Sequence, residues 1–221
     1  FKVGDEVYAR PSDHRIGTFA EYIAVHENDL AYKPKNISME EAASIPLVGL
    51  TSWQALVEIA KLQKGQKVFI QAGSGGVGTF AIQLAKHLGA FVATTTSAAN
   101  VQLVKRLGAD LIIDYKKEDF VTVLKDYDVV LHSNRDAKVL ENSLKILKPG
   151  GTLVSLTGPP TSEFAKEIGL GWHVQMLMGL LGMSAQRKAK KRNVKFKFLF
   201  MRAEGKQLAE ITSLIEAGRI R

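Results

Sequence analysis

The sequence predicts an α/β protein built on a doubly wound, six-stranded parallel sheet. From Lys67 onwards, short apolar runs alternate with amphipathic stretches of helical period, and a glycine-rich turn separates the first run from the first helix. Strands covered on both faces are near-continuous apolar runs, and parallel neighbours need crossover helices between them. The six expected strands span residues 67–72, 91–96, 111–114, 128–132, 152–156 and 195–201.

Two of the expected crossover helices gather their apolar side chains on one face, as packing against a sheet requires. In the helix after the glycine-rich turn, this face consists of Val77, Ala81, Leu84, Ala85 and Leu88. In the helix before Pro149, it consists of Leu140, Leu144 and Leu147. Six strands with such crossovers match a nucleotide-binding sheet.

The segment before this sheet follows a different pattern. Short alternating stretches at residues 6–9 and 19–25, broken by Gly, Pro and Asp, predict antiparallel strands. Ser38 and Glu41 have the spacing of a capping box, which predicts a short helix ending near Pro46. We expect Thr51 or Ser52 to cap a second helix.

The glycine-rich turn is Gly73-Ser74-Gly75-Gly76-Val77-Gly78, in which Gly73, Gly75 and Gly78 satisfy G-x-G-x-x-G. The string alone is weak evidence, and a purely structural turn is the alternative. Its position between a strand and a helix favours a Rossmann dinucleotide site, because the glycines allow a tight turn, a close approach of pyrophosphate and close helix–strand packing. The pyrophosphate would lie at the helix N-terminus.

The choice between NAD and NADP depends on the residues about 20 positions beyond the loop, where an NAD site usually has an acidic residue. This chain has Thr94-Thr95-Thr96-Ser97 there, with hydroxyls in place of a carboxylate. We therefore expect NADP(H) as the cofactor. Lys105 and Arg106 lie further along, where solvated helix charges are the simpler interpretation.

Ligands of such sheets bind outside the carboxyl ends of the strands. Three segments fall there, at residues 96–97, 132–134 and 155–158. His132 is a candidate acid or base, although a packing or hydrogen-bonding role is the simpler interpretation. Phe196, Phe198 and Phe200 alternate along the last strand, which favours core packing, with Phe200 near the cofactor as the alternative.

Composition narrows the function classes. The 221 residues contain no cysteine, which excludes disulfides, a thiolate nucleophile and any zinc site with sulfur ligands. No apolar run reaches the roughly 18 residues of a membrane span, and the opening residues 1–5 do not resemble a signal peptide, so we expect a cytoplasmic protein. The chain begins without Met and inside strand-like sequence, from which we expect a fragment of a longer protein.

The formal charge of +8 is concentrated in residues 187–192, which read Arg-Lys-Ala-Lys-Lys-Arg. A nucleic acid, an anionic membrane surface and a phosphate-rich ligand are the partners that such a run could indicate. A solvated face is the simpler interpretation, because no helix-turn-helix or aromatic-interleaved pattern accompanies the run. We expect neither a nucleic-acid nor a membrane partner.

Several stretches together resemble the medium-chain dehydrogenase/reductase superfamily, specifically its zinc-independent NADPH:quinone oxidoreductase (zeta-crystallin-like) branch. The resemblance covers nearly the whole chain and is much more specific than the glycine loop alone. The matching stretches are residues 1–7, 17–22, 49–53, 72–78 with Gln83 and Lys86, 107–110 and 148–151.

This resemblance implies two domains: residues 1–33 as part of a GroES-like catalytic β-barrel, and residues 34–221 as the Rossmann NAD(P)-binding domain. It also allows a test for zinc. The structural cysteines of the zinc-dependent branch would fall near residues 10–15, and its catalytic cysteine at Leu47. Neither place has a cysteine, and the five histidines lack ligand spacing, so we expect no metal.

The resemblance also implies cofactor contacts for individual residues. Thr51 would lie near the nicotinamide ribose, and Ser133 and Thr157 near the nicotinamide. The pyrophosphate would contact Ser74, Gly75, Gly76 and Val77, and the 2′-phosphate and adenine would contact Thr96, Asn100 and Tyr115. Two departures stand out: the family often has lysine where Asn100 stands, and Asp or Asn where His132 stands.

The implied activity is hydride transfer from NADPH to a small-molecule quinone or α,β-unsaturated carbonyl (an enone or enal). No residue of the chain is identified as the acid that would supply the proton, so the catalytic residues are unassigned. The alternative is a cofactor-binding structural or regulatory protein without turnover, as in crystallins. We expect a homodimer, since relatives commonly pair through their sheet edges.

Overall fold

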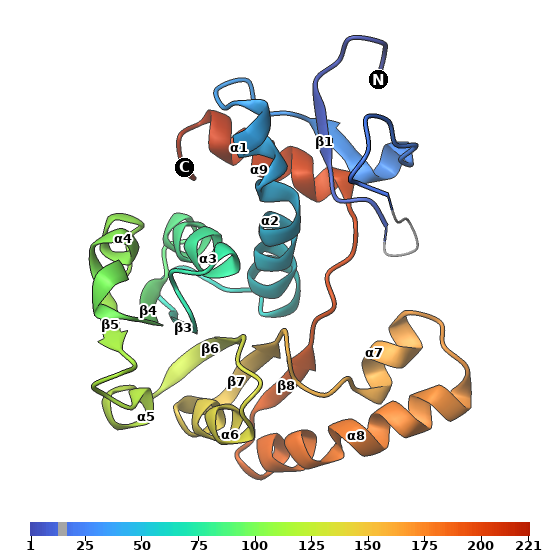
Figure 1. Ribbon diagram of the computed structural model, residues 1–221. Coiled ribbons are helices and arrows are strands. Elements are labelled where there is room, and N and C mark those ends of the chain that lie inside the picture. Colours follow the sequence, from blue (N-terminus) through green and yellow to red (C-terminus); the bar gives the residue numbers. More distant parts are fainter. Residues whose placement is uncertain (13–16) are drawn as a thin grey trace.

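The computed structural model describes residues 1–12 and 17–221, so His14, one of the five histidines considered above, lies outside the described residues. The predicted sheet is confirmed: six parallel strands lie in the order β5-β4-β3-β6-β7-β8 (Figure 1). The strands are β3 (Lys67–Ile70), β4 (Phe91–Thr96), β5 (Leu111–Asp114), β6 (Tyr127–His132), β7 (Leu147–Ser155) and β8 (Lys195–Phe198). The chain reverses its winding direction between β3 and β6, the switch point at which such sheets bind ligands.

Helices cover both faces of the sheet, and strands β3 to β7 contribute to two cores. Val68 and Ile70 of β3 point into one core, whereas Phe69 between them points into the other. The first core includes α2 (Ile45–Trp53), α3 (Gly76–His87) and α9 (Gly205–Glu216). The second includes α5 (Phe120–Val123), α6 (Ala137–Lys145) and α8 (Trp172–Lys191). This two-sided burial explains why the strands are continuous apolar runs.

The remaining short elements lie at the sheet edges and in the connections. They are η1 (Glu27–Asp29), α1 (Met39–Ala43), the π-helical turn η2 (Gln54–Ile59), η3 (Ala98–Asn100), α4 (Val101–Arg106) and α7 (Ser162–Glu167). The capping box before α1 is confirmed, because the Glu41 N–H donates to Ser38 Oγ (3.2 Å) and the Ser38 N–H donates to Glu41 Oε2 (2.8 Å).

The first helix ends at Ala43, close to the expected end near Pro46. The expected start of the second helix at Thr51 or Ser52 is wrong, because α2 already begins at Ile45. Pro46 lies in its first turn, where a missing N–H costs nothing. Thr51 and Ser52 are inside α2, and their hydroxyls donate to the carbonyls of Leu47 (2.7 Å) and Val48 (2.8 Å). Such back-bonding to the preceding turn satisfies the hydroxyls without ending a helix.

At the N-terminus, β1 (Val7–Ala9) and β2 (Leu30–Tyr32) form a separate two-stranded antiparallel sheet. The strand expected at residues 19–25 is wrong: no strand is present there, and Phe19 and Tyr22 are fully or almost fully exposed. An alternating segment becomes a strand only when it finds a hydrogen-bonding partner and a surface to cover. Within the described residues, β1 pairs with β2 instead.

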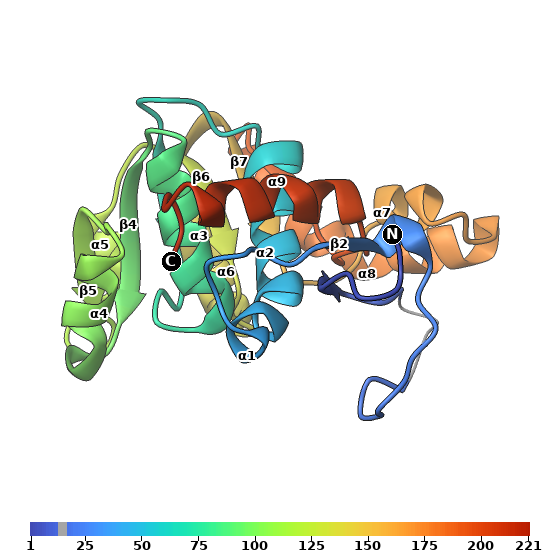
Figure 2. The ribbon, with the colours of Figure 1, turned by 90° about the horizontal axis from the view of Figure 1, so that it is seen from above.

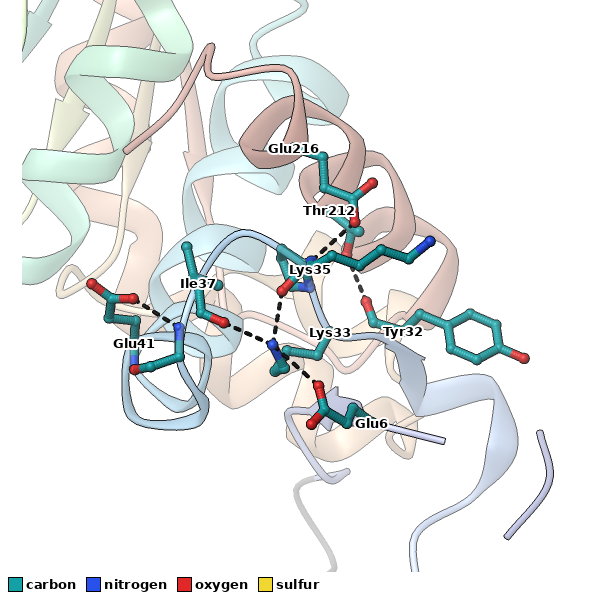
Figure 3. Close-up of polar contacts among 10 residues, drawn as sticks. Glu6, Tyr32, Lys33, Lys35, Ile37, Glu41, Thr212 and Glu216 are labelled. Atoms are coloured by element: carbon teal, nitrogen blue, oxygen red, sulfur yellow. Dashed lines mark hydrogen bonds and ion pairs between the residues drawn. The ribbon is translucent and has the colours of Figure 1, made fainter. Parts of the chain in front are cut away.

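The connection from β2 into the rest of the chain is tied down by polar contacts (Figure 3). Lys33 is almost fully buried, and its ammonium donates to the carbonyls of Pro34 (2.9 Å) and Ile37 (2.7 Å) and lies 3.3 Å from a Glu6 carboxylate oxygen. From α9, Thr212 Oγ1 donates to the Tyr32 carbonyl (2.9 Å). The small sheet is therefore attached to α9, as Figure 2 also shows from above.

Helices α7 and α8 were not expected from the sequence. They follow β7 and pack on each other beside β8, where they project from one side of the molecule (Figures 1 and 2). Among the described residues, no helix combines the length and apolarity needed to cross a membrane.

Candidate nucleotide site

The glycine loop leaves β3 through a residue in the left-handed region, Ala72, at a φ of 53°. Gly73 takes the place next to it because a Cβ there would collide with the Thr94 side chain. At Gly78 a Cβ would collide with the Ala72 carbonyl oxygen and would lie 2.7 Å from Gly73 Cα. The first and last glycines thus permit close packing, while the sharp turn itself is made at Ala72.

Gly75, the second glycine of the motif, has open space beside its backbone. A Cβ on Gly75 would meet only the Ala72 carbonyl oxygen, at 3.3 Å. Gly75 is also the N-cap of α3, which has 12 residues and no side chain to cap its first N–H groups. Those groups and the helix dipole favour an anion at this end. The loop therefore presents free donors beside an open backbone surface.

A crevice of about 830 Å³ opens beside this loop, at the carboxyl ends of β3, β4 and β6. This volume is in the range of small-molecule and cofactor sites. Its wall on the loop side consists of Gln71, Ala72, Ser74, Gly75, Thr95 and Thr96. The opposite walls consist of residues 115–120 after β5, Ser133 and Asn134 after β6, and Lys138, Val139 and Asn142 of α6.

Five of the residues predicted to bind the cofactor line this one crevice: Ser74, Gly75, Thr96, Tyr115 and Ser133. Thr96 Oγ1 donates to Ser74 Oγ at 3.0 Å, which joins the end of β4 to the glycine loop. The Ser133 N–H donates to Gln71 Oε1 at 3.1 Å, which joins the ends of β6 and β3. Tyr115 is largely exposed at the mouth. The site is held together by bonds between neighbouring strands.

The other predicted residues lie outside the lining of the crevice. Gly76 and Val77 form the first turn of α3, and Val77 packs partly against the first core. Asn100 ends η3, and Thr51 is nearly buried within α2. Thr157 Oγ1 donates to the Asn134 carbonyl at 2.8 Å, which places Thr157 just behind a lining residue.

Phe200 lies elsewhere. The strand ends at Phe198, so Phe200 does not continue its alternation and is more than half exposed. Its ring is 6.3 Å from that of Phe164 on α7, and both line a second hollow with Phe198. Phe196, by contrast, is in the second core.

Sequence reasoning missed three cations at the crevice. Lys116 and Lys117 follow Tyr115 directly, and Lys138 lies in the first turn of α6. Acidic neighbours, Glu118 and Asp119, share this wall, but Asp119 caps α5 through the Val121 N–H and also accepts from Asn142 Nδ2. The signal available in the sequence was the position of the lysine pair, immediately after the tyrosine that the resemblance had assigned.

His132 is buried at the carboxyl end of β6, with 1% of its surface exposed. Its Nδ1 lies 3.1 Å from Ser155 Oγ, which also accepts from the Gly158 N–H (2.9 Å). Nε2 has no hydrogen-bond partner among the described residues. Burial lowers the pKa of His132 to about 4, so the imidazole is neutral near pH 7. His132 is therefore packed behind the crevice. This favours a packing or hydrogen-bonding role over a role as acid or base.

Comparison with known proteins identifies the chain's relatives. A family model described as zinc-binding dehydrogenase matches residues 107–221. Over 174 residues the chain is 43% identical to "2-methylene-furan-3-one reductase" of Solanum lycopersicum, covering 74% of this chain and 44% of that protein. It is 36% identical to "NAD(P)H oxidoreductase RTN4IP1, mitochondrial" of Mus musculus, covering all of this chain and 57% of that protein.

A solved structure of similar shape extends this likeness to the fold. The quinone oxidoreductase from Coxiella burnetii matches with a TM-score of 0.82 at 29% identity, covering 100% of this chain and 63% of that one. The chain thus spans about half to two thirds of the length of the proteins it matches.

The name of the matched family implies zinc, and the residues of this chain do not fit that metal. The sequence has no cysteine, and within the described ranges no three His, Asp or Glu side chains are grouped as a metal site would need. The fold and the family match remain unaffected, because the nucleotide-binding sheet does not depend on zinc. The chain therefore belongs to the zinc-binding dehydrogenase family, within the medium-chain dehydrogenase/reductase superfamily and its quinone oxidoreductase-like branch.

Proposed function

We propose that the chain is the cofactor-binding part of an NADPH-dependent oxidoreductase that reduces a quinone or an α,β-unsaturated carbonyl. The observation that supports this most is the crevice at the switch point between β3 and β6, formed beside an open glycine loop and lined by hydroxyls and lysines. Relatives named as a furanone reductase and, in Arabidopsis thaliana, as an "NADPH-dependent alkenal/one oxidoreductase" support the same reaction class.

In this proposal the pyrophosphate lies against Gly75, Gly76 and Val77 at the start of α3, where the free N–H groups and the dipole favour its charge. Ser74 and Thr96 supply hydroxyls to the 2′-phosphate, and Tyr115 borders the adenosine. Lys116 and Lys117 supply the positive charge that Asn100 lacks. Ser133 and Thr157 border the nicotinamide.

NADPH, when bound, supplies the hydride. The chain's own part is to hold it in one orientation, and the links between strand ends serve this purpose. The Asn134 carbonyl is fixed by Thr157 Oγ1, and the Ser133 N–H is fixed by Gln71, so the walls at β6 and β7 are preformed. Preformed walls reduce the entropy cost of positioning a reactant. No described residue is proposed as the proton donor.

The test uses the full-length protein with NADPH and a panel of quinones and enones. We expect acceptor-dependent loss of NADPH absorbance, and lower activity at subsaturating NADPH in Gly75→Ala, which adds a methyl group on the pyrophosphate side. NADPH that binds but is never consumed would contradict the proposal. It would favour the alternative, a cofactor-binding protein without turnover, in which NADPH only raises the melting temperature.

Three further expectations belong to this proposal. Residues 1–33 belong to a GroES-like catalytic domain and residues 34–221 to the nucleotide-binding domain, supported by the separation of the β1–β2 sheet from the large one. The protein is a homodimer, supported by β8, whose outer edge has no partner strand in the described chain. Its location is cytoplasmic. Sedimentation of the full-length protein tests the dimer.

A further inference from the structure

Helix α8 has two faces of different character. Its inner face consists of small residues, Gly182, Ala185 and Ala189, which are buried. Contact is close there, because a Cβ on Gly182 would lie 2.7 Å from the Pro160 carbonyl oxygen. The inner face is thus fully used in packing against the body of the protein, and it leaves the longer side chains of the helix on the outer side.

The first turns of the outer face are apolar. Met176, Leu177, Leu180 and Leu181 are each more than half exposed, and Trp172 at the start of the helix is 69% exposed. Their spacing of three and four residues aligns them on one side of the helix. Four large aliphatic side chains in a continuous row differ from the scattered apolar residues of an ordinary surface, and such patches mark interaction sites.

The last turns of the same face are cationic. Continuing the spacing from Leu180 passes through Ser184 to Arg187, Lys188 and Lys191, all exposed. Lys188 donates to Glu141 of α6 at 2.7 Å, whereas Arg187 and Lys191 make no ion pair within the part of the chain that the structure describes. From Trp172 to Lys191 the helix contains no Asp or Glu. The outer face therefore calls for a partner that is apolar at one end and anionic at the other.

We propose that α8 docks the protein on an anionic lipid surface. The apolar turns would enter the boundary between headgroups and acyl chains, with Trp172 at headgroup depth, and the basic end would contact lipid phosphates and carboxylates. The helix projects at the rim of the molecule, and none of the residues lining the nucleotide crevice belongs to it (Figures 1 and 2). Docking therefore leaves the crevice open.

Two other partners fit the face less well. A nucleic acid would use the cations but would leave the leucine row in water, since its backbone is recognised through phosphates. A second copy could cover the leucines, but its own α8 has no acidic residue to receive the cations, and each chain has a formal charge of +8. The proposal departs from the expectation from sequence of no membrane partner, and it does not depend on the proposed reaction.

The test is co-sedimentation of the full-length protein with vesicles of phosphatidylcholine alone or of phosphatidylcholine with phosphatidylserine. We expect binding to the serine-containing vesicles only, weakening as salt is added. Leu177→Ser with Leu180→Ser, and separately Arg187→Gln with Lys191→Gln, should each lower the partition coefficient at least tenfold. The matched control, Lys105→Gln with Arg106→Gln on α4, removes two exposed charges elsewhere and should change it less than twofold.

Unchanged melting temperature and NADPH affinity in the variants would show that they are folded. Wild-type protein that stays in the supernatant with both vesicle types would overturn the proposal. An equal fall in the partition coefficient of the α4 control would also overturn it, because vesicle binding would then depend only on net charge. A serine variant that converts a dimer into a monomer, with no vesicle binding by the wild type, would assign the face to a second copy.

Discussion

The glycine loop and the outer face of α8 meet solvent in opposite ways. At the loop, backbone atoms are packed so closely that Gly73 and Gly78 have no room for a methyl group, and the surface presented is polar. On α8, the packed face is made of small residues and the surface presented is a row of leucines and cations. The glycine loop has a rigid shape that suits one small charged ligand. The outer face of α8 suits a broad surface without a defined shape.

The largest expected effect follows from the loop being backbone-packed. Gly78→Ala places a methyl group against the Ala72 carbonyl and Gly73 Cα, and neither can move without shifting β3. We expect a loss of about 3 kcal/mol in the free energy of unfolding, at the upper end for overpacking, and no measurable NADPH binding. Urea denaturation and fluorescence titration measure these two quantities.

Gly75→Ala is the matched control for this change. Its methyl group meets a single atom at 3.3 Å, so stability should change by less than about 0.5 kcal/mol. NADPH affinity should still fall roughly tenfold, because the pyrophosphate loses its close approach. Equal destabilisation by the two alanine substitutions would contradict the different roles assigned to the two glycines.

The second effect concerns His132, which lies behind the crevice. Burial lowers its pKa to about 4 from an ordinary 6.5, so between these values the unfolded chain binds a proton that the folded chain does not. The contribution of neutral, buried His132 to the free energy of unfolding has its full value above pH 6.5. It decreases as the pH falls to 4 and changes no further below that. The total is about 3 kcal/mol for this shift.

His132→Asn should remove that part of the pH dependence. The comparison needs the unfolding free energy of both proteins at several pH values between 7 and 4. If the two curves run parallel throughout, His132 titrates normally in the folded protein and its burial has been misjudged.

A smaller effect distinguishes the lysines of the crevice wall. Lys116→Gln with Lys117→Gln should weaken NADPH binding by about 1 kcal/mol, as expected for partly solvated charge contacts. Binding of NADH should be unchanged, because it lacks the 2′-phosphate. An equal loss for both nucleotides would mean that the pair acts on the pyrophosphate or on the fold, and not on the 2′-phosphate.

The smallest effect is expected on the outer face of α8. Leu180→Ser on α8 should change the unfolding free energy by less than about 0.5 kcal/mol, because the side chain is mostly in water. Leu144→Ala, in a side chain with 1% exposure, should cost about 2 to 5 kcal/mol. Thermal or urea unfolding compares them. Similar losses at both positions would mean that α8's outer face is packed after all.

The same contrast explains what could be predicted from sequence. The sheet was predictable because its strands are buried on both faces, so runs such as Val68 to Ile70 are apolar regardless of their neighbours. Helix α8 was not, because its buried face consists of Gly and Ala while its leucines face outwards, the reverse of the usual amphipathic pattern. The strand expected at residues 19–25 failed because strand pairing depends on a partner, which local pattern does not specify.

The candidate site was partly predictable for a similar reason. The glycine loop comes shortly after the end of β3, and Thr96 ends β4. Their approach was predictable because the carboxyl ends of parallel strands meet at one edge of the sheet. Lys116, Lys117 and Lys138 belong to a loop and a helix start whose approach to the glycine loop depends on the whole fold. The prediction for Phe200 assumed that β8 continues to residue 201, but the strand ends at Phe198. Strand boundaries are the part of a pattern that sequence determines least.

We expect the crevice beside the glycine loop to select NADP(H) over NAD(H). Titrating the protein with NADPH and with NADH, followed by nucleotide fluorescence, tests this most directly. Hydroxyls at Ser74 and Thr96, with lysines opposite and no carboxylate at the end of β4, predict that NADPH binds at least roughly tenfold more tightly. Equal affinity for the two nucleotides, or tighter binding of NADH, would contradict this selectivity.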